Sequence, residues 1–269
     1  MTGSYGFKIK TLLLLFTFAG VSSAANALIV TEATSVVDTD NTNLSNKLTA
    51  AAFTVTTNAG VPGGSLATYQ QIWDTRFNQI VLSPSDIAAY TTYLAGGGNL
   101  FLMGENTGFN TRNNSIAAFI ASVGGGAITI LTPNNSVTVL PPFATGITNP
   151  FTFLAAAGTH STGPYAAIAV DSAGNAPAIL YGPHSLSATP AGSLIVVFDV
   201  NFMGSGADAN SQQLTVNLIG YLAAPFGVAP TYPPASGAVP ALSTWAFVLL
   251  AAGLAFIAFR LMGKKQLVG

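Results

Sequence analysis

Two apolar segments, one near each end of the chain, constrain most strongly what this sequence can fold into. Lys8 and Lys10 precede an apolar run over residues 11–21, and the small residues that follow end in Ala25-Asn26-Ala27. A basic start, a short apolar run and an A-x-A pattern are typical of a secretory signal peptide, and they predict cleavage after Ala27. The alternative is a transmembrane helix, but about eleven residues are short of the roughly twenty that cross a bilayer.

The second apolar segment covers residues 239–259 and contains no charged side chain. At about 1.5 Å per helical residue it is long enough to cross a hydrocarbon core of roughly 30 Å. Trp245 lies near its outer edge, and Arg260, Lys264 and Lys265 follow it. The positive-inside rule places this basic end in the cytoplasm, so we expect the preceding domain on the outer side of the membrane.

This C-terminal region resembles the IPTL-CTERM sorting tail and is similar to its PEP-CTERM relative. The resemblance is carried by a short proline motif, an apolar helix and a basic end, and the motif residues are Val239, Pro240, Ala241, Leu242 and Trp245. It implies a membrane-embedded processing enzyme of the exosortase or archaeosortase type as a partner. The alternative is a plain membrane anchor, and both alternatives end the protein at the cell envelope.

The chain between these ends divides into a domain and a linker. Residues 224–238 are rich in proline, glycine and alanine, a composition that favours an extended stalk. We therefore expect a signal peptide over residues 1–27, a single domain over 28–223, a linker over 224–238 and a sorting or transmembrane tail over 239–269. About 200 residues are enough for one domain with a sizeable core.

The charge and cysteine content of the domain exclude several classes of function. Residues 28–223 contain all nine acidic residues but only three basic ones, Lys47, Arg76 and Arg112, for a net charge of −6. Nucleic acid is therefore an unfavourable partner. The absence of cysteine removes disulfides, thiolate metal sites and a cysteine nucleophile. No residue pattern predicts a metal or another cofactor.

Short apolar runs alternate with helical patterns along the domain, which predicts an α/β fold with a mainly parallel sheet. We expect strands at residues 28–31, 53–57, 71–74, 99–103, 127–131, 166–170, 178–181 and 193–199. We expect helices at residues 42–52, 87–95, 113–123 and 210–222. Residues 132–164 fit no clean period, and they predict loops or an added β-hairpin.

The clearest local signal surrounds residues 83–108. Ser83-Pro84-Ser85-Asp86 has the pattern of a capping box with proline at the first helical position, and three glycines at residues 96–98 stop the helix. A buried strand and a turn at Gly104-Glu105-Asn106-Thr107-Gly108 follow. Together with a later strand that ends in Phe198-Asp199-Val200-Asn201, this order resembles the class I glutamine amidotransferase-like fold, a flavodoxin-like three-layer sandwich.

The resemblance implies where catalytic residues would stand, and this sequence has other residues there. Gly104-x-Asn106-x-Gly108 has the spacing of a G-x-S-x-G nucleophile elbow, but asparagine cannot act as the nucleophile. The family's His-x-Glu pair falls at Asp199 and Asn201. We therefore expect a domain without acyl-transfer chemistry. Glu105, Asn106, Asp199 and Asn201 remain a candidate ligand site at the carboxyl end of the sheet.

Two alternatives stay open for these residues. In the first, Glu105 and Asn106 bind a polar ligand. In the second, Glu105 caps the turn that follows it and Asn106 accepts an unusual backbone angle. For the function, we expect a non-catalytic envelope protein whose domain serves in binding or display at the cell envelope. The alternative is an extracytoplasmic hydrolase or carbohydrate-active enzyme that uses carboxylates such as Glu105, Asp199 or Asp74.

Overall fold

The computed structural model describes residues 25–32, 38–131, 136–153, 158–161, 164–189, 191–199, 201–204 and 206–223. The predicted signal peptide, except for Ala25 to Ala27, and the predicted linker and tail lie outside the described residues. The helices are α1 (Asp38–Ala50), α2 (Pro84–Ala95), α3 (Asn110–Ser122) and α4 (Ala209–Ala223), with 3-10 turns η1 (Leu66–Thr68), η2 (Thr107–Phe109) and η3 (Asn201–Met203). Within the described residues no helix is both long and apolar enough to span a membrane.

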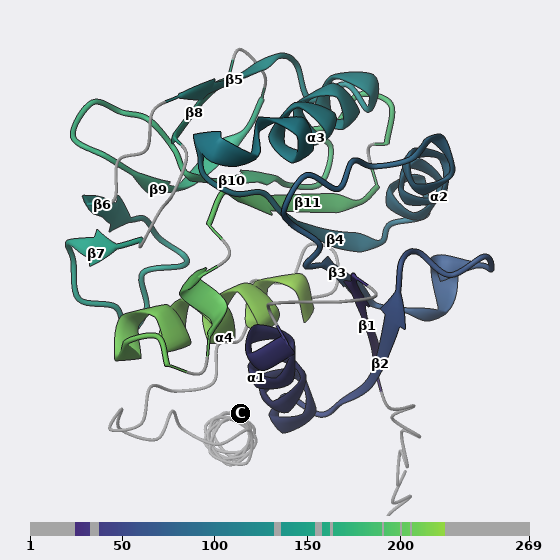
Figure 1. The fold of residues 1–269 in the computed structure, drawn as a ribbon, viewed down its shortest axis with the longest axis horizontal. Coiled ribbons are helices and arrows are strands. Elements are labelled where there is room, and N and C mark those ends of the chain that lie inside the picture. The colour runs from purple at the N-terminus through teal and green to yellow at the C-terminus, as the bar shows by residue number, and fades with distance from the viewer. Residues whose placement is uncertain are drawn as a thin grey trace, which may run out of the picture.

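The eleven strands of the described residues form one large mixed sheet and one small sheet. Figure 1 shows how the two sheets are arranged. The large sheet has the order β2-β1-β3-β4-β11-β10-β9-β6-β7, and the small one pairs β5 with β8. The first five strands of the large sheet are parallel, and the other four continue it as antiparallel neighbours. The bounds are β1 (Ala25–Thr31), β2 (Phe53–Ala59), β3 (Gln71–Asp74), β4 (Asn99–Met103), β5 (Ile128–Leu131), β6 (Ser136–Val139), β7 (Phe151–Thr152), β8 (Gly158–Ser161), β9 (Ala166–Val170), β10 (Ala178–Tyr181) and β11 (Ser193–Val197).

Helices cover both faces of the parallel strands, with α1 and α4 on one side and α2 and α3 on the other (Figure 1). Strands buried on both faces carry mostly apolar side chains, and residues 100–103 of β4 are all apolar and buried. Leu100 and Leu102 pack into the cluster beneath α2 and α3, whereas Phe101 and Met103 pack into the cluster beneath α1 and α4. The predicted α/β class and the α/β alternation are confirmed.

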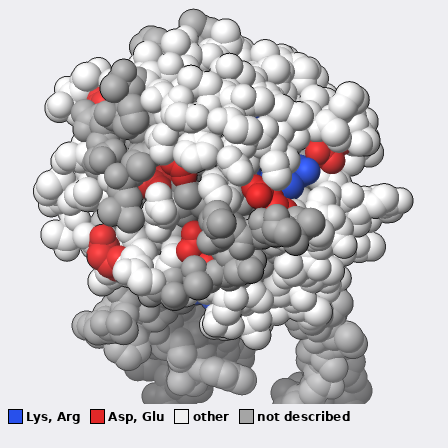
Figure 2. Space-filling model, viewed as in Figure 1, with Lys and Arg blue, Asp and Glu red and all other residues white. Residues whose placement is uncertain are grey.

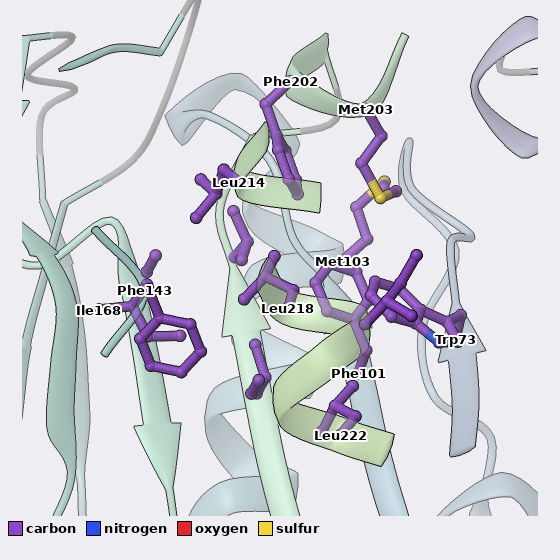
Figure 3. Close-up of a cluster of buried hydrophobic side chains, with 14 of the residues drawn as sticks. Trp73, Phe101, Met103, Phe143, Ile168, Phe202, Met203, Leu214, Leu218 and Leu222 are labelled. Carbon is purple, nitrogen blue, oxygen red and sulfur yellow. The ribbon is translucent and has the colours of Figure 1, made fainter. Parts of the chain in front are cut away.

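The cluster beneath α1 and α4 is the larger of the two apolar cores, and Figure 3 shows its centre. Trp73 stacks on Phe101 with ring centroids 4.6 Å apart. Leu214, Leu218 and Leu222 of α4 are fully buried against the same cluster. This spacing of four residues places all three side chains on one face of the helix, which fixes α4 to the sheet.

The predicted helix start at Ser83 is confirmed in detail. The Ser83 hydroxyl accepts a hydrogen bond from the Asp86 amide, the Asp86 carboxylate accepts one from the Ser83 amide, and Pro84 is the first helical residue. Tyr90, Tyr93 and Leu94 are buried along one face of α2. The helix ends at Ala95, where the glycines begin.

Several predicted bounds differ from the observed ones. The first strand begins at Ala25 and not at residue 28, and the first helix begins at Asp38 and not at residue 42. The last strand ends at Val197, two residues earlier than expected, because the chain turns at Phe198 and Asp199. Within residues 132–164, β6 and β7 pair antiparallel, which agrees with the expected hairpin, and β8 joins β5 in the small sheet.

Candidate functional site

An acidic residue stands at or just beyond the carboxyl end of four adjacent parallel strands. Glu32 follows β1, Asp74 ends β3, Glu105 follows β4, and Asp199 follows β11. These strands are neighbours in the order β1-β3-β4-β11, so their ends meet along one line that we call the carboxyl edge. Ligands of open α/β sheets bind in this place, which makes the carboxyl edge the first site to test.

The structure brings the four predicted site residues to neighbouring strand ends. Met103 of β4 stands opposite Val197 of β11, and the Gly104 amide donates to the Val197 carbonyl over 2.8 Å. The turns that follow these strands carry Glu105 with Asn106 and Asp199 with Asn201. Glu105 and Asp199 are 1% and 0% exposed, whereas Asn106 is half-buried and Asn201 is exposed. Only the two asparagines therefore present side chains at the surface.

Glu105 organises the turn after β4. One of its carboxylate oxygens accepts hydrogen bonds from the Asn106 amide at 2.7 Å and from Asn106 Nδ2 at 2.8 Å. The expected capping role of Glu105 is thus observed, but the expected unusual angle at Asn106 is wrong because its φ is −60° and its ψ is 172°. Asn106 instead caps η2, and its Oδ1 accepts from the Gly108 amide. The turn therefore lacks the strained geometry of a nucleophile elbow.

A buried asparagine on α3 forms hydrogen bonds with the backbone of the same turn. Asn113 accepts from the Glu105 amide at 3.0 Å and donates through Nδ2 to the carbonyls of Glu105 and Asn106 at 2.7 and 3.1 Å. Asn113 is fully buried. Its amide thus satisfies three backbone groups that the turn leaves without a strand partner.

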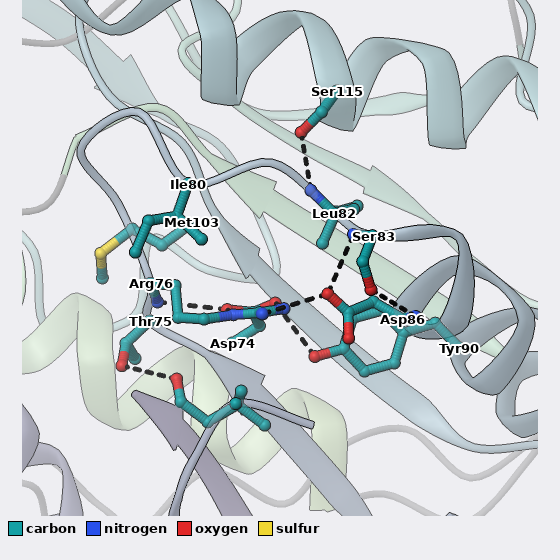
Figure 4. A network of polar contacts seen from close by, with 12 residues as sticks. Asp74, Thr75, Arg76, Ile80, Leu82, Ser83, Asp86, Tyr90, Met103 and Ser115 are labelled. Carbon is teal, nitrogen blue, oxygen red and sulfur yellow. Dashed lines mark hydrogen bonds and ion pairs between the residues drawn. The ribbon is translucent and has the colours of Figure 1, made fainter. Parts of the chain in front are cut away.

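Asp74 lies in a buried ion cluster that no local sequence pattern predicts (Figure 4). Arg76 Nη2 approaches Asp74 Oδ2 to 2.6 Å, and Arg76 Nη1 reaches Asp86 Oδ2 at 3.1 Å. Arg112 Nη2 lies 3.2 Å from Asp74 Oδ1 as an ion pair, and the Tyr90 hydroxyl donates to Asp74 Oδ2 over 3.0 Å. The cluster joins β3, α2 and α3, so its first role is to fix these elements to one another.

Burial and charge act in opposite directions on the Asp74 carboxyl. Burial alone raises its pKa, but the charge of Arg112 together with the hydrogen bond and charge of Arg76 outweighs this, and the pKa lies below its usual range. Burial and the neighbouring Asp74 carboxylate raise the pKa of Tyr90 well above its usual value. Asp74 is therefore an ionised structural group at neutral pH. A general acid needs a raised pKa, whereas the pKa of Asp74 is lowered.

Apart from the Asp74 cluster, the acidic side chains at this edge form separate hydrogen bonds with their own chain. Among the described residues, no three His, Cys, Asp or Glu side chains are placed to hold a metal ion together. In Figure 2 most of the visible surface is white, and the acidic side chains form small separate groups. Glu32 accepts from the Phe77 amide over 2.9 Å, and Asp199 accepts from the Asn201 amide over 2.7 Å. The acidic residues at the strand ends thus all bind their own chain.

A pocket of about 740 Å³ opens at the opposite, amino edge of the sheet. It lies where β3 and β4 begin and where α2 and α4 end, and no charged residue lines it. Tyr69 and Tyr93 supply its aromatic surface, and Gln70, Thr92 and Asn99 supply neutral polar groups. The sequence alone does not predict this pocket. The three glycines at residues 96–98 are the one signal for it, because they leave the wall without side chains.

Both ends of the described domain lie at this amino edge. β1 starts there at Ala25, and α4 returns there from the carboxyl edge, since Asn99 Nδ2 at the start of β4 donates to the Leu222 carbonyl over 2.9 Å. Leu222 and Ala223 also line the pocket. Ala25 and Ala223, the first and last described residues of the domain, therefore both lie on the side away from Glu105 and Asp199.

Comparisons with known proteins identify the fold only. No family model and no curated protein matches the sequence. The mmIFT52 N-terminal domain aligns with a TM-score of 0.56 at 12% identity, over 74% of this chain and 97% of that chain. Exo-beta-1,4-mannosidase Op5Man5 from Opitutaceae bacterium strain TAV5 aligns with a TM-score of 0.50 at 12% identity, over 80% of this chain and 37% of that chain. A ThuA-like protein from Parabacteroides merdae ATCC 43184 aligns with a TM-score of 0.44 at 11% identity, over 74% of this chain and 90% of that chain.

Proposed function

We propose that this chain is an exported cell-envelope protein whose domain binds or displays at the surface and does not catalyse a reaction. In this proposal residues 1–27 contain the export signal, residues 224–238 form the stalk, and residues 239–269 anchor the protein or direct its sorting. The processing partner would be an enzyme of the exosortase or archaeosortase type. The leading evidence for export is the pair of apolar ends with their flanking basic residues.

One structural observation carries the proposal, which is that Ala25 and Ala223 lie at the same edge of the sheet. In this proposal the chain leaves the domain at the end of α4, at the amino edge, and continues into the stalk. The carboxyl edge, with Asn106 and Asn201 at its surface, would then face away from the membrane. This geometry favours contact between the carboxyl edge and partners outside the cell.

The finer fold assignment is also part of the proposal. The parallel strands in the order β2-β1-β3-β4-β11 match the 2-1-3-4-5 order of flavodoxin-like sandwiches. A class I amidotransferase-like domain has this core, and the turn at Gly104 to Gly108 takes the place of its nucleophile. We propose an amidotransferase-like domain in which Asn106, Asp199 and Asn201 replace the reactive residues.

The alternative, a carboxylate-based hydrolase or carbohydrate-active enzyme, has less support. Asp74 is held by two arginines, Glu105 by Asn106 and Asp199 by the Asn201 amide, and all three carboxylates are buried. A glycosidase needs two carboxyl groups that face a common cleft. The mannosidase that shares the fold aligns at 12% identity and over 37% of its own length, so its activity is no guide to this chain.

Fractionation of the native protein tests the proposal. The full chain and a Pro240→Ala, Leu242→Ala double variant would be followed by intact mass in cytosol, membrane and extracellular fractions. We expect the wild-type chain to lack its leader and to occur in the envelope or outside the cell, and the double variant to change in processing or location. Unchanged behaviour of the variant would reduce the tail to a plain anchor, and a cytosolic chain that keeps Met1 would refute export.

A further inference from the structure

The first strand contains three residues that cleavage after Ala27 would remove. Ala25, Asn26 and Ala27 open β1, where they pair in register with the first three residues of β2. β1 lies inside the sheet, between β2 and β3, and Ala27 also stands opposite Gln71 of β3. A chain that began at residue 28 would therefore lose three of the seven residues in an interior strand.

These three residues make specific contacts with the rest of the domain. The Gln70 amide donates to the Asn26 carbonyl over 2.8 Å, and Asn26 Nδ2 donates to the Thr68 carbonyl over 3.2 Å. The Ala27 side chain is fully buried in the apolar cluster beneath α1 and α4, and Ala25 packs against the same cluster. Their loss would uncover that core and leave backbone groups of β2 and of Gln70 without partners.

We infer that the leader is removed between Ala24 and Ala25. This inference rests on the proposed export, and it replaces the predicted mature start at Leu28 with one at Ala25. Ser22 and Ala24 provide small residues three places and one place before the bond, the same small-x-small pattern that Ala25 and Ala27 provide for the later bond. The leader pattern fits both bonds, but only the earlier cut leaves β1 whole.

The reaction is the hydrolysis of one peptide bond by a membrane-bound leader peptidase. Water adds across the Ala24–Ala25 bond, the carbonyl side leaves as the Ala24 carboxylate, and the Ala25 nitrogen becomes the new α-amino group. That amino group then stands at the amino edge of the sheet, next to the start of β2. Cleavage at this bond requires no change in the strand register.

The N-terminus of the exported full-length protein tests the inference. The protein would be produced in a host with a secretory pathway, isolated from the envelope or medium, and analysed by N-terminal sequencing and intact mass. Two variants separate the two bonds. Ala24→Leu places a large residue directly before the proposed bond and leaves Ala25-x-Ala27 intact, whereas Ala25→Leu alters the later pattern and leaves Ser22-x-Ala24 intact.

We expect the wild-type chain to begin at Ala25, the Ala24→Leu chain to lose that terminus, and the Ala25→Leu chain still to begin at residue 25. A wild-type terminus at Leu28 that only Ala25→Leu abolishes would overturn the inference and leave export standing. An uncleaved chain that begins at Met1 in the cytosol would overturn both. The three outcomes are distinguishable by mass alone.

Discussion

Asp74 and Arg112 face one another in the interior, with Asp74 Oδ1 and Arg112 Nη2 3.2 Å apart and both side chains fully buried. Arg112 also donates through Nε to the Met103 carbonyl at 3.2 Å and through Nη1 to the Ile80 carbonyl at 3.3 Å. One side chain on α3 thus connects the ends of β3 and β4 with the loop before α2. In a domain with so few charged residues, this ion pair fixes the elements of the carboxyl edge to one another.

Removal of the Arg112 charge should be costly. Arg112→Met leaves Asp74 with a single arginine partner, and it also leaves the Met103 and Ile80 carbonyls without their donor. We therefore expect a loss of about 3–5 kcal/mol in the free energy of unfolding. Lys47→Met removes a charge from half-buried Lys47 on α1 and serves as the matched control, with an expected change within about 0.5 kcal/mol. Urea denaturation followed by circular dichroism measures both, and equal effects would contradict the structural role of the pair.

The low pKa of Asp74 predicts an acid dependence of stability. An unfolded aspartate titrates near 3.9, and the folded pKa is lower, so the stabilisation is complete above the unfolded value and is lost as the pH falls through the folded one. The free-energy difference between wild type and Asp74→Asn should therefore be large at pH 7 and shrink below about pH 4. Urea titrations from pH 7 to pH 3 measure this difference, and one that stays constant with pH would contradict the assignment.

Asn113→Ala should loosen the turn that carries Glu105 and Asn106. The change removes three hydrogen bonds from buried backbone groups, and we expect a loss of at least about 2 kcal/mol in the free energy of unfolding. Asn114→Ala, at the next and exposed position of α3, is the control and should change stability by less than about 0.5 kcal/mol. Hydrogen exchange at residues 104–108 should accelerate in the Asn113 variant alone.

Gly192 should tolerate no side chain. A Cβ there would lie 2.6 Å from the Leu94 carbonyl oxygen and 2.7 Å from the Gly98 carbonyl oxygen, and these are backbone atoms that cannot turn away. We expect Gly192→Ala to lower the free energy of unfolding by about 1–3 kcal/mol. Gly63→Ala meets nothing within 4 Å, so it should be neutral or slightly stabilising. Thermal unfolding of the two variants under one condition compares them directly.

The sequence predicts local structure well where one physical signal is strong. The Ser83 capping box, the glycines at residues 96–98 and the apolar run of β4 identify a helix, its end and a buried strand. The alternation of short apolar runs with helical patterns is a similarly strong signal, and it predicts the α/β class. The order of the strands depends on long-range pairing, and no local pattern contains it.

The candidate site was less predictable. The sequence predicts that Glu105 and Asp199 lie at strand ends. The burial of their carboxylates and the ion cluster of Arg76 and Arg112 depend on contacts between residues far apart in the chain. The turn at Asn106 has ordinary backbone angles because Glu105 and Asn113 hold it. The sequence also does not reveal the start of β1, because residues 25–27 fit both an A-x-A pattern and the start of a strand.

Accessibility from outside the membrane tests the central claim most directly. The chain contains no cysteine, so single Val81→Cys and Gln266→Cys variants can be labelled without background by a membrane-impermeant maleimide on spheroplasts. Val81 is 46% exposed in the domain, and Gln266 lies in the basic end of the tail. We expect the Val81 variant to be labelled on intact spheroplasts, and those chains of the Gln266 variant that keep their tail to be labelled only after permeabilisation. Labelling of the Val81 variant only after permeabilisation would place the domain inside the cell and contradict the proposal.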